Sequence, residues 1–425
     1  MAEARADRLP QGLHGALLMA ALTLAVRLAV IWLQPIAPLL PDYAEYEALA
    51  QTMAEEGTYG FGRHLDNNPP LQASYWPFLY ERHEAMFRPP GFPLFLVVVR
   101  ALAGPSHLAL AIALALVEAL TAFALMRLVE RHYGPRTATL TTLLFAFSPG
   151  GAALVNKLAR EALLTLATVI FVFLFLRAKE TGRVRLALGA GVLAGLATYV
   201  KETALLLVVG AVAWSTLLAW QARKPQLLRL GVAVALGAGL LITPWIARNS
   251  LIKHKPMGFT CVGFQWYVSL VPVTTWHLKA TQAELAAVDP FQAKDCADVG
   301  DRLAGVTRQY LAERPLEAAT TAVGNAAWFW SPWPRWTLPE ELPPIQQVAV
   351  ATTALTLLLS ACGFWLRRRE AFTQFLALLL ALTTVAHLTS LGVPRFRVPF
   401  EPLLFLMAAL AIEALAARFK RPTAA

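Results

Sequence analysis

Two arginines near the end of the chain have a spacing suited to binding an anion. Arg395 and Arg397 alternate in the proline-bounded string VPRFRVP, and alternate residues of an extended segment point to the same side. Two guanidinium groups on one side can donate charge-assisted hydrogen bonds to a phosphate. We therefore predict that the pair binds a phosphate group. The alternative is that both arginines anchor a helix end among lipid headgroups.

A pair of acidic residues has the spacing of a helix start. Asp42 and Glu45 form the D-x-x-E of an N-terminal cap in the string PDYAEYEALA, where side-chain oxygens accept hydrogen bonds from free backbone amides. The residues themselves therefore predict a cap.

Imidazole and carboxylate side chains also gather in one polar stretch and suggest a metal site. They are His64, Asp66, His83 and Glu84. Their spacing matches no closed metal site, and the chain has neither a glycine-rich phosphate loop nor a G-x-S-x-G string. We therefore expect no metal and no cofactor, with a divalent metal as the alternative.

The elements that position these residues are apolar helices. The chain is 57% hydrophobic and 15% charged, which is more apolar than one soluble core requires. Ten stretches approach the ~20 residues that a bilayer requires. They lie near 12–33, 106–129, 135–149, 161–177, 185–200, 202–221, 227–246, 346–366, 371–389 and 399–417. We predict an all-α polytopic membrane protein with about ten transmembrane helices, forming one membrane-embedded domain over 1–425. Arg27 and Glu118 fall inside predicted spans and are expected to pair.

The basic residues indicate which side of the membrane each connection faces. They cluster in every second gap between the apolar stretches, at Arg5/Arg8, Arg127/Arg131/Arg136, Arg177/Lys179/Arg183/Arg185, Arg223/Lys224/Arg229, Arg367/Arg368/Arg369 and Arg418/Lys420/Arg421. Short connections rich in Lys and Arg stay in the cytoplasm. We therefore predict a protein of the cell inner (plasma) membrane with both termini cytoplasmic. These cytoplasmic clusters explain the net charge of +10, so no nucleic-acid partner is expected.

Two segments are too long to be simple connections and are predicted to face outward. The first covers 35–105 and begins with an amphipathic helix, in which Tyr43 and Tyr46 lie on the apolar stripe while Glu45 and Glu47 face water. The second covers 247–345 and has helical patterns around 281–287 and 299–323.

Cys261 and Cys296 both fall in the second outward segment. A compartment outside the cytoplasm permits oxidation, so we predict a disulfide between them. Separate buried thiols are the alternative. Cys362 lies in a predicted helix and is expected to remain a free, packed thiol.

Several short strings, taken in order, resemble one family. They are PDYAEYEALA, FRPPGFPLFL, FAFSPGGAALVNKLAREALLTL, ATYVKETALLL, TPWIARN and VPRFRVPFEPLL. Together they resemble the GT-C glycosyltransferases, specifically the dolichyl-phosphate-mannose–protein mannosyltransferase branch that includes bacterial aminoarabinose transferases. The resemblance covers about 12–417, although the second outward segment carries little of it.

The resemblance implies a reaction at the outer membrane face. A sugar would pass, with inversion, from a polyprenyl-phosphate donor to a lipid, glycan or protein acceptor. Such a transfer requires a base for the acceptor hydroxyl and cations for the departing phosphate. By position, Asp42 matches the family's aspartate and is the expected general base, with Glu45 as a secondary candidate. Glu161 matches a family carboxylate that helps to organise the site.

Basic residues near these strings are the expected phosphate ligands. Lys201 stands where the family usually has a basic residue, commonly arginine, and an ion pair with Glu202 is its alternative role. The other candidates are Arg88, Arg248, Lys157 and Arg160. For Arg88 the alternative is a side chain extended along the membrane interface.

Two other functional classes remain as alternatives. A transporter or flippase for a lipid-linked solute would have charges near the middle of the bilayer and repeats related by symmetry. This chain instead concentrates its charges in the outward segments and has no evident repeat. A structural assembly subunit would leave Asp42 dispensable.

Overall fold

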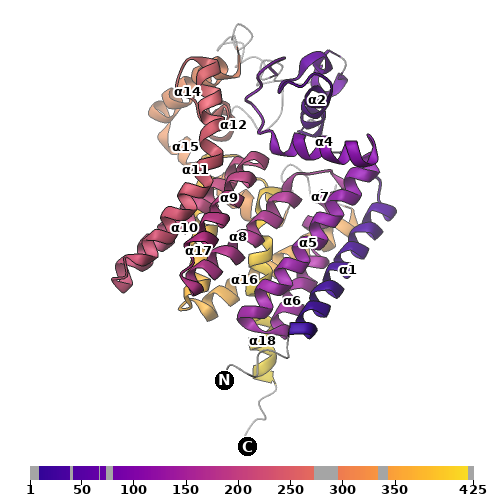
Figure 1. The fold of residues 1–425 in the computed structure, drawn as a ribbon, viewed down its shortest axis with the longest axis vertical. Coiled ribbons are helices and arrows are strands. Elements are labelled where there is room, and N and C mark those ends of the chain that lie inside the picture. Colours follow the sequence, from indigo (N-terminus) through magenta and orange to yellow (C-terminus); the bar gives the residue numbers. More distant parts are fainter. Residues whose placement is uncertain are drawn as a thin grey trace, which may run out of the picture.

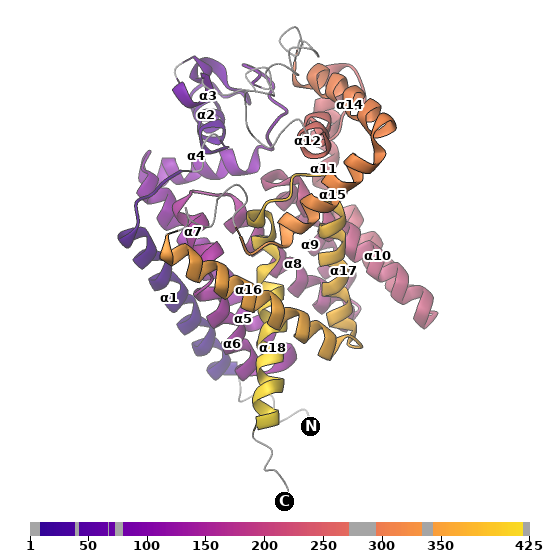
Figure 2. The ribbon, with the colours of Figure 1, turned by 180° about the vertical axis from the view of Figure 1, so that it is seen from behind.

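The protein is a bundle of long helices with two helical lobes at one end (Figures 1 and 2). The computed structural model describes residues 9–38, 42–66, 68–72, 80–271, 295–333 and 343–419. Every regular element in these ranges is an α-helix or a 3-10 helix, so the predicted all-α membrane class is confirmed. The protein is a multi-pass membrane protein.

The bundle contains a helix for each of the ten predicted apolar stretches. They are α1 (Leu9–Leu33), α5 (His107–Tyr133), α6 (Pro135–Ala146), α8 (Glu161–Thr181), α9 (Val184–Val200), α10 (Leu205–Ala222), α11 (Gln226–Lys253), α16 (Pro344–Arg367), α17 (Ala371–Ala386) and α18 (Glu401–Phe419). Within the described part, seven helices are long and apolar enough to cross a membrane, or eight if α6 and α7 (Pro149–Asn156) form one bent span. Because α9 and α17 are shorter, ten crossings remains a prediction.

The break between α6 and α7 is caused by the local sequence, and it shapes the site. Ser148 caps α7 by accepting a hydrogen bond from the amide of Gly151 at 3.3 Å, and Pro149 occupies the first helical turn. Proline fits the first turn because the amide it lacks would have no partner there. The two helices meet at 42°, and α7 leads directly into the connection that carries Lys157, Arg160 and Glu161.

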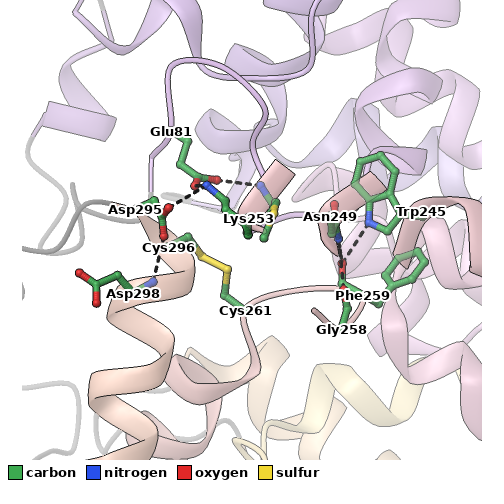
Figure 3. The surroundings of a disulfide bond; sticks show 11 residues. Glu81, Trp245, Asn249, Lys253, Gly258, Phe259, Cys261, Asp295, Cys296 and Asp298 are labelled. Carbon is green, nitrogen blue, oxygen red and sulfur yellow. Dashed lines mark hydrogen bonds and ion pairs between the residues drawn. A yellow bond between two sulfur atoms is a disulfide. The ribbon is translucent and has the colours of Figure 1, made fainter. Parts of the chain in front are cut away.

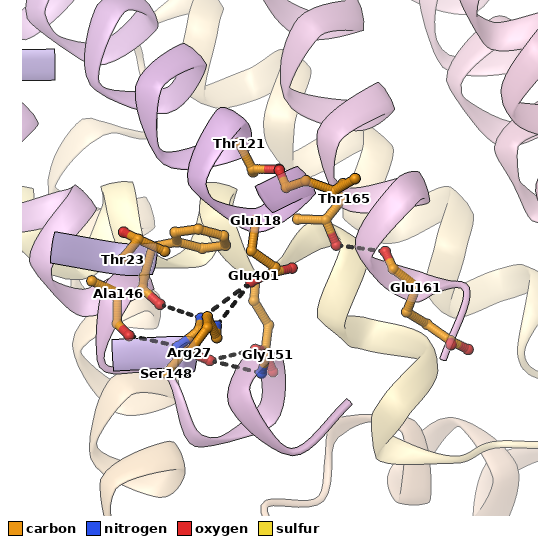
Figure 4. Close-up of polar contacts among 12 residues, drawn as sticks. Thr23, Arg27, Glu118, Thr121, Ala146, Ser148, Gly151, Glu161, Thr165 and Glu401 are labelled. Carbon is orange, nitrogen blue, oxygen red and sulfur yellow. Dashed lines mark hydrogen bonds and ion pairs between the residues drawn. The ribbon is translucent and has the colours of Figure 1, made fainter. Parts of the chain in front are cut away.

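A buried ion pair holds this break in place (Figure 4). Arg27 on α1 pairs with Glu118 on α5 at 3.1 Å, as predicted. The same guanidinium donates to the carbonyl oxygens of Ala146 at 2.7 Å and Phe145 at 3.1 Å, at the end of α6. Arg27 therefore donates to the Ala146 carbonyl at the break, and it adds a second hydrogen bond to the Phe145 carbonyl, which also accepts from the amide of Ser148.

Small residues allow a close contact between two helices of the bundle. A Cβ atom on Gly191 of α9 would lie 2.1 Å from the carbonyl oxygen of Val234 on α11, and one on Gly237 would lie 2.3 Å from that of Leu188. Membrane helices associate through such close backbone approach rather than through the hydrophobic effect.

The two lobes lie together at one end of the bundle (Figures 1 and 2). The first contains α2 (Asp42–Glu55), η2 (Gly62–Leu65), α3 (Pro69–Gln72) and α4 (Gly91–Ala103), and the second contains α12 (Val262–Leu270), α14 (Cys296–Glu313) and α15 (Pro315–Trp330). The helical pattern predicted over 299–323 corresponds to α14 and α15. The pattern over 281–287 lies outside the described residues.

Lys253 joins the two lobes (Figure 3). Its ammonium group donates to Glu81 of the first lobe at 2.6 Å and to Asp295 of the second at 3.1 Å. Asp295 also caps α14 by accepting from the amide of Asp298. Ion pairs that share one cation and satisfy a helix end fix the relative position of the segments they connect.

Basic clusters from distant parts of the sequence meet at the other end of the bundle. Arg131 pairs with Glu180 at 2.9 Å, Tyr133 donates to Glu370 at 3.1 Å, and Arg136 lies 3.6 Å from Glu413. The start of α1 and the end of α18 lie at this end as well (Figure 1). Arg5, Arg8, Lys420 and Arg421 lie outside the described residues.

We predict that this basic end faces the cytoplasm and the two lobes face outward. In a Cys362→Ser background, Lys224→Cys should be protected from a membrane-impermeant thiol reagent in intact cells. Thr320→Cys on α15 should be labelled, and both sites are exposed. Labelling of Lys224→Cys with protection of Thr320→Cys would reverse the orientation.

Cys261 and Cys296 form a disulfide in the structure, with their Cα atoms 6.2 Å apart (Figure 3). We predict that it forms in the native protein. A bridge closing a loop of this length contributes roughly 3–4 kcal/mol in the chain-entropy model. Intact-mass analysis after alkylation without reductant should find one alkylated cysteine. Three alkylated cysteines would rule the bridge out.

Cys362 does not occupy the packed position that the sequence suggested. It is a free cysteine, but it is exposed. The reason is that α16 lies on the outside of the bundle, where only 11% of its apolar stretch is buried. A helix in lipid can be apolar on every side, so hydrophobicity alone does not predict which residues are packed.

Candidate active site

The centre of the candidate site is the carboxylate of Asp42, in the first turn of α2. One oxygen accepts a hydrogen bond from Arg88 at 2.8 Å, and the other accepts from Arg395. Arg88 lies just before α4, and Arg395 lies in the 3-10 helix η7 (Pro394–Phe400). Burial by itself would raise the pKa of Asp42, but the two guanidinium groups outweigh it and hold this pKa well below its usual range.

Glu45 also contributes to the site, contrary to the prediction that it faces water. It is 3% exposed, and its carboxylate accepts from Arg88 and from the hydroxyl of Tyr80, the latter at 2.8 Å. Burial, together with the charge of Asp42, raises the pKa of Glu45 against the opposing effect of Arg88. The helical pattern does not predict this burial, because the first lobe covers the polar face of α2.

A third carboxylate, Glu161, lies at the start of α8 and is 1% exposed. Its Oε1 atom is 3.5 Å from the Lys201 ammonium and 3.9 Å from Arg395. The expected alternative, an ion pair between Lys201 and its neighbour Glu202, is therefore wrong. Lys201 follows the end of α9 in extended conformation, and this directs its side chain toward α8.

Lys201 is a cation whose charge depends on pH near neutrality. It is 5% exposed, and its ammonium lies 3.4 Å from the centre of the Phe396 ring. Burial lowers the pKa of Lys201 to about 7 despite the opposing charge of Glu161. The positive charge at this position is therefore lost as the pH rises through neutrality, unless an anion binds beside it.

Three other predicted residues have different surroundings. Arg160 is buried and donates to the carbonyl oxygen of Val200 at 3.1 Å. Lys157 is exposed at the rim of the site, and desolvation and Arg395 lower its pKa. Arg248 is not part of the Asp42 cluster. It stacks on Trp245, with its guanidinium carbon 4.6 Å from the ring centre, and donates to Asn249.

Arg397 does not share a face with Arg395, and the prediction of an extended segment is wrong. Residues two apart lie on different sides of a 3-10 helix, because this helix has three residues per turn. Arg397 is 2% exposed. It pairs with Glu401 at 3.3 Å and donates to the carbonyl oxygens of Phe329 and Ser331 at 2.8 and 3.1 Å. It connects α18 to the end of α15, and its contacts are structural.

The site as a whole carries more positive than negative groups. Its cations are Arg88, Lys157, Arg160, Lys201 and Arg395, and its carboxylates are Asp42, Glu45 and Glu161. Four of these residues, Asp42, Arg160, Glu161 and Arg395, line a cavity of about 10 Å³ together with Tyr43, Tyr46, Leu158 and Ala159. All the cations except Lys157 are at least partly buried, and such an excess of positive charge favours an anionic ligand.

The four residues considered for a metal have other partners or stand apart. Asp66 pairs with Arg82, and His64 lies 3.3 Å from Glu55. The described part of the chain contains no group of three or more residues suited to holding a metal ion.

Solved structures of an archaeal oligosaccharyltransferase share this fold. The oligosaccharyltransferase AglB from Archaeoglobus fulgidus, in complex with an inhibitory peptide and a dolichol-phosphate, aligns with a TM-score of 0.58 and 13% identity over 98% of this chain and 52% of its own. Its apo form aligns with a TM-score of 0.60 and 14% identity over the same shares. ArnT from Cupriavidus metallidurans bound to undecaprenyl phosphate aligns with a TM-score of 0.42 and 17% identity over 94% of this chain and 77% of its own. The chain spans about half the length of AglB.

At 13–14% identity, the likeness to the archaeal oligosaccharyltransferase shows a shared fold. Residues 87–247 match the family described as dolichyl-phosphate-mannose-protein mannosyltransferase, which confirms the resemblance inferred from the sequence strings. The matched segment contains Arg88, the whole connection from Lys157 to Glu161, and Lys201. No curated protein matches the chain in sequence.

Proposed function

We propose that the protein transfers a sugar from a polyprenyl-phosphate donor to an acceptor at the outer membrane face, with inversion. The observation that carries this proposal is the position of Asp42 between Arg88 and Arg395. Asp42, two further carboxylates and several cations, drawn from distant parts of the chain, meet at the end of a membrane bundle. This is the set of groups that such a transfer requires.

The proposed step is a single displacement at the sugar. The acceptor oxygen forms a bond to the anomeric carbon, and the bond from that carbon to the phosphate oxygen breaks with its electron pair. The acceptor proton passes to Asp42, and the polyprenyl phosphate leaves as an anion held by Arg395, Arg88 and Lys201. No general acid is required because a phosphate is a stable leaving group.

Phosphate binding also makes Asp42 a better base. The two arginines hold the pKa of Asp42 low in this structure. A phosphate that takes hydrogen bonds from Arg395 and Arg88 weakens their pairing with Asp42, which raises its affinity for a proton. The base therefore gains strength when the donor is in place.

An apolar cavity at the start of α18 suits the prenyl chain. It has a volume of about 300 Å³ and is lined by residues of α6, α16 and α18, including Leu144, Leu357 and Leu404. Its polar lining includes Ser148 and Glu401, which lie 3.4 Å apart where α7 and α18 begin. A lipid with its chain in this cavity would place its headgroup toward η7.

Mass spectrometry of the purified protein with added cell-envelope lipids tests the proposal. We expect a bound species with the mass of a polyprenyl phosphate carrying a sugar, which would also identify the sugar. Incubation with candidate lipid, glycan and protein acceptors should then move this mass to one of them. Movement of the intact donor across a vesicle membrane without any transfer would instead show a flippase.

A further inference from the structure

Tyr46 has a buried hydroxyl whose role the reaction described so far does not explain. The side chain is 3% exposed, and its oxygen has no hydrogen-bond partner among the described residues. Nearby tyrosines are satisfied, since Tyr80 donates to Glu45 at 2.8 Å and Tyr59 donates to the carbonyl oxygen of Arg88 at 2.6 Å. Buried polar groups almost always have a partner, so this exception among the described residues leaves the hydroxyl available for a bound ligand.

The position of Tyr46 places it in the candidate site. It follows Asp42 by one helical turn, so both lie on the same face of α2, and both line the 10 Å³ cavity. The guanidinium carbons of Arg88 and Arg160 lie 5.4 and 5.2 Å from its ring centre. The ring packs edge-on against Phe92, with centres 5.1 Å apart, which limits its reorientation.

The surroundings of the hydroxyl determine what it can bind. Burial raises the pKa of Tyr46 to about 12, so the hydroxyl stays protonated and can donate a hydrogen bond. Neither Arg88 nor Arg160 can accept one, because a guanidinium group has no acceptor. Asp42 and Glu161 line the same cavity, but neither carboxylate forms a hydrogen bond with the hydroxyl. The missing partner is therefore an acceptor that also suits a cationic site, and an oxyanion meets both conditions.

We propose that the Tyr46 hydroxyl donates a hydrogen bond to the phosphate of the polyprenyl carrier, which makes Tyr46 a further catalytic residue. This inference rests on the proposed function. The cavity holds about one water molecule and is too small for a phosphate, so the carrier must separate Arg395 from Asp42 as it enters. The phosphate then lies against a neutral donor as well as cations, and this donor favours the oxygen on which charge accumulates as the sugar leaves.

Tyr46→Phe removes the hydroxyl and keeps the ring against Phe92. We expect it to weaken binding of undecaprenyl phosphate in detergent micelles about tenfold, as for one hydrogen bond to a charged group. The melting temperature should stay the same or rise, because the variant removes a buried polar atom without a protein partner. A purely structural role would not separate these two readouts.

Tyr133→Phe is the matched control. Its hydroxyl donates to Glu370 at 3.1 Å at the basic end of the bundle, and undecaprenyl phosphate binding should not change. Binding by Tyr46→Phe at wild-type affinity would overturn the proposal, and so would weaker binding together with a lower melting temperature. If wild-type protein binds undecaprenyl phosphate no better than undecaprenol, the proposed function itself fails.

Discussion

Asp42→Asn is expected to lower sugar transfer by roughly 10²-fold or more while the protein remains folded. The amide is nearly isosteric with the carboxylate, and its oxygen can still accept from Arg88 or Arg395, but it cannot take the acceptor proton. Turnover of purified protein should fall without loss of donor binding, because a neutral amide holds Arg88 and Arg395 less strongly than the carboxylate does.

The control for this prediction is Glu45→Gln, one turn along the same helix. Glu45 also pairs with Arg88, so this variant perturbs the same arginine and keeps Asp42 intact. We expect a smaller loss of turnover than for Asp42→Asn. Near-normal turnover of Asp42→Asn with inactive Glu45→Gln would assign the base to Glu45.

Arg395→Ala should weaken use of the donor by roughly 2–4 kcal/mol, on the scale of losing one partner of a desolvated charge pair. Arg395 contacts Asp42 and lies near Glu161, so its guanidinium is at the point where the phosphate oxygens are expected. Arg395→Lys should recover only part of the loss, because a point charge cannot reproduce a planar fork. Donor dependence of initial rates measures both effects.

Arg397→Ala is the matched comparison, two residues along the same 3-10 helix. Removing Arg397 leaves Glu401 without its buried partner and costs stability, on the order of 3–5 kcal/mol. A lower melting temperature in detergent is therefore expected for this variant, but not for Arg395→Lys. Full rescue by Arg395→Lys, with normal donor affinity in Arg395→Ala, would show that Arg395 only anchors the helix end.

The sequence predicted the parts of the fold that depend on composition and local pattern. Apolar length located the bundle helices, and the ordered strings indicated a resemblance that the family match over residues 87–247 supports. Asp42 and Arg395 were both candidates, and the structure brings them together. Their contact joins residues 353 positions apart, so no local pattern could have predicted it.

The remaining differences have physical causes of the same kind. Pro394 and Pro399 restrict the backbone to φ values that suit an extended segment and a 3-10 helix alike. The string alone therefore does not show that the Arg395 and Arg397 side chains lie on different sides. The prediction that Glu45 faces water is wrong because helical periodicity does not show that other parts of the first lobe cover the polar face of α2. The hydroxyl of Tyr46 was overlooked because an aromatic ring on an apolar stripe is usually part of a core. Its spacing of four residues from Asp42 was the one available signal.

The central claim is tested most directly by measuring release of polyprenyl phosphate. Purified wild-type protein and Asp42→Asn would be reconstituted in vesicles with polyprenyl-phosphate sugars extracted from the native membrane and with envelope acceptors. The account predicts that wild-type protein releases polyprenyl phosphate in equal amount to glycosylated acceptor, and that Asp42→Asn does so at least roughly a hundredfold more slowly. Equal release by both proteins, or no release by the wild type while the intact donor crosses the membrane, would contradict it.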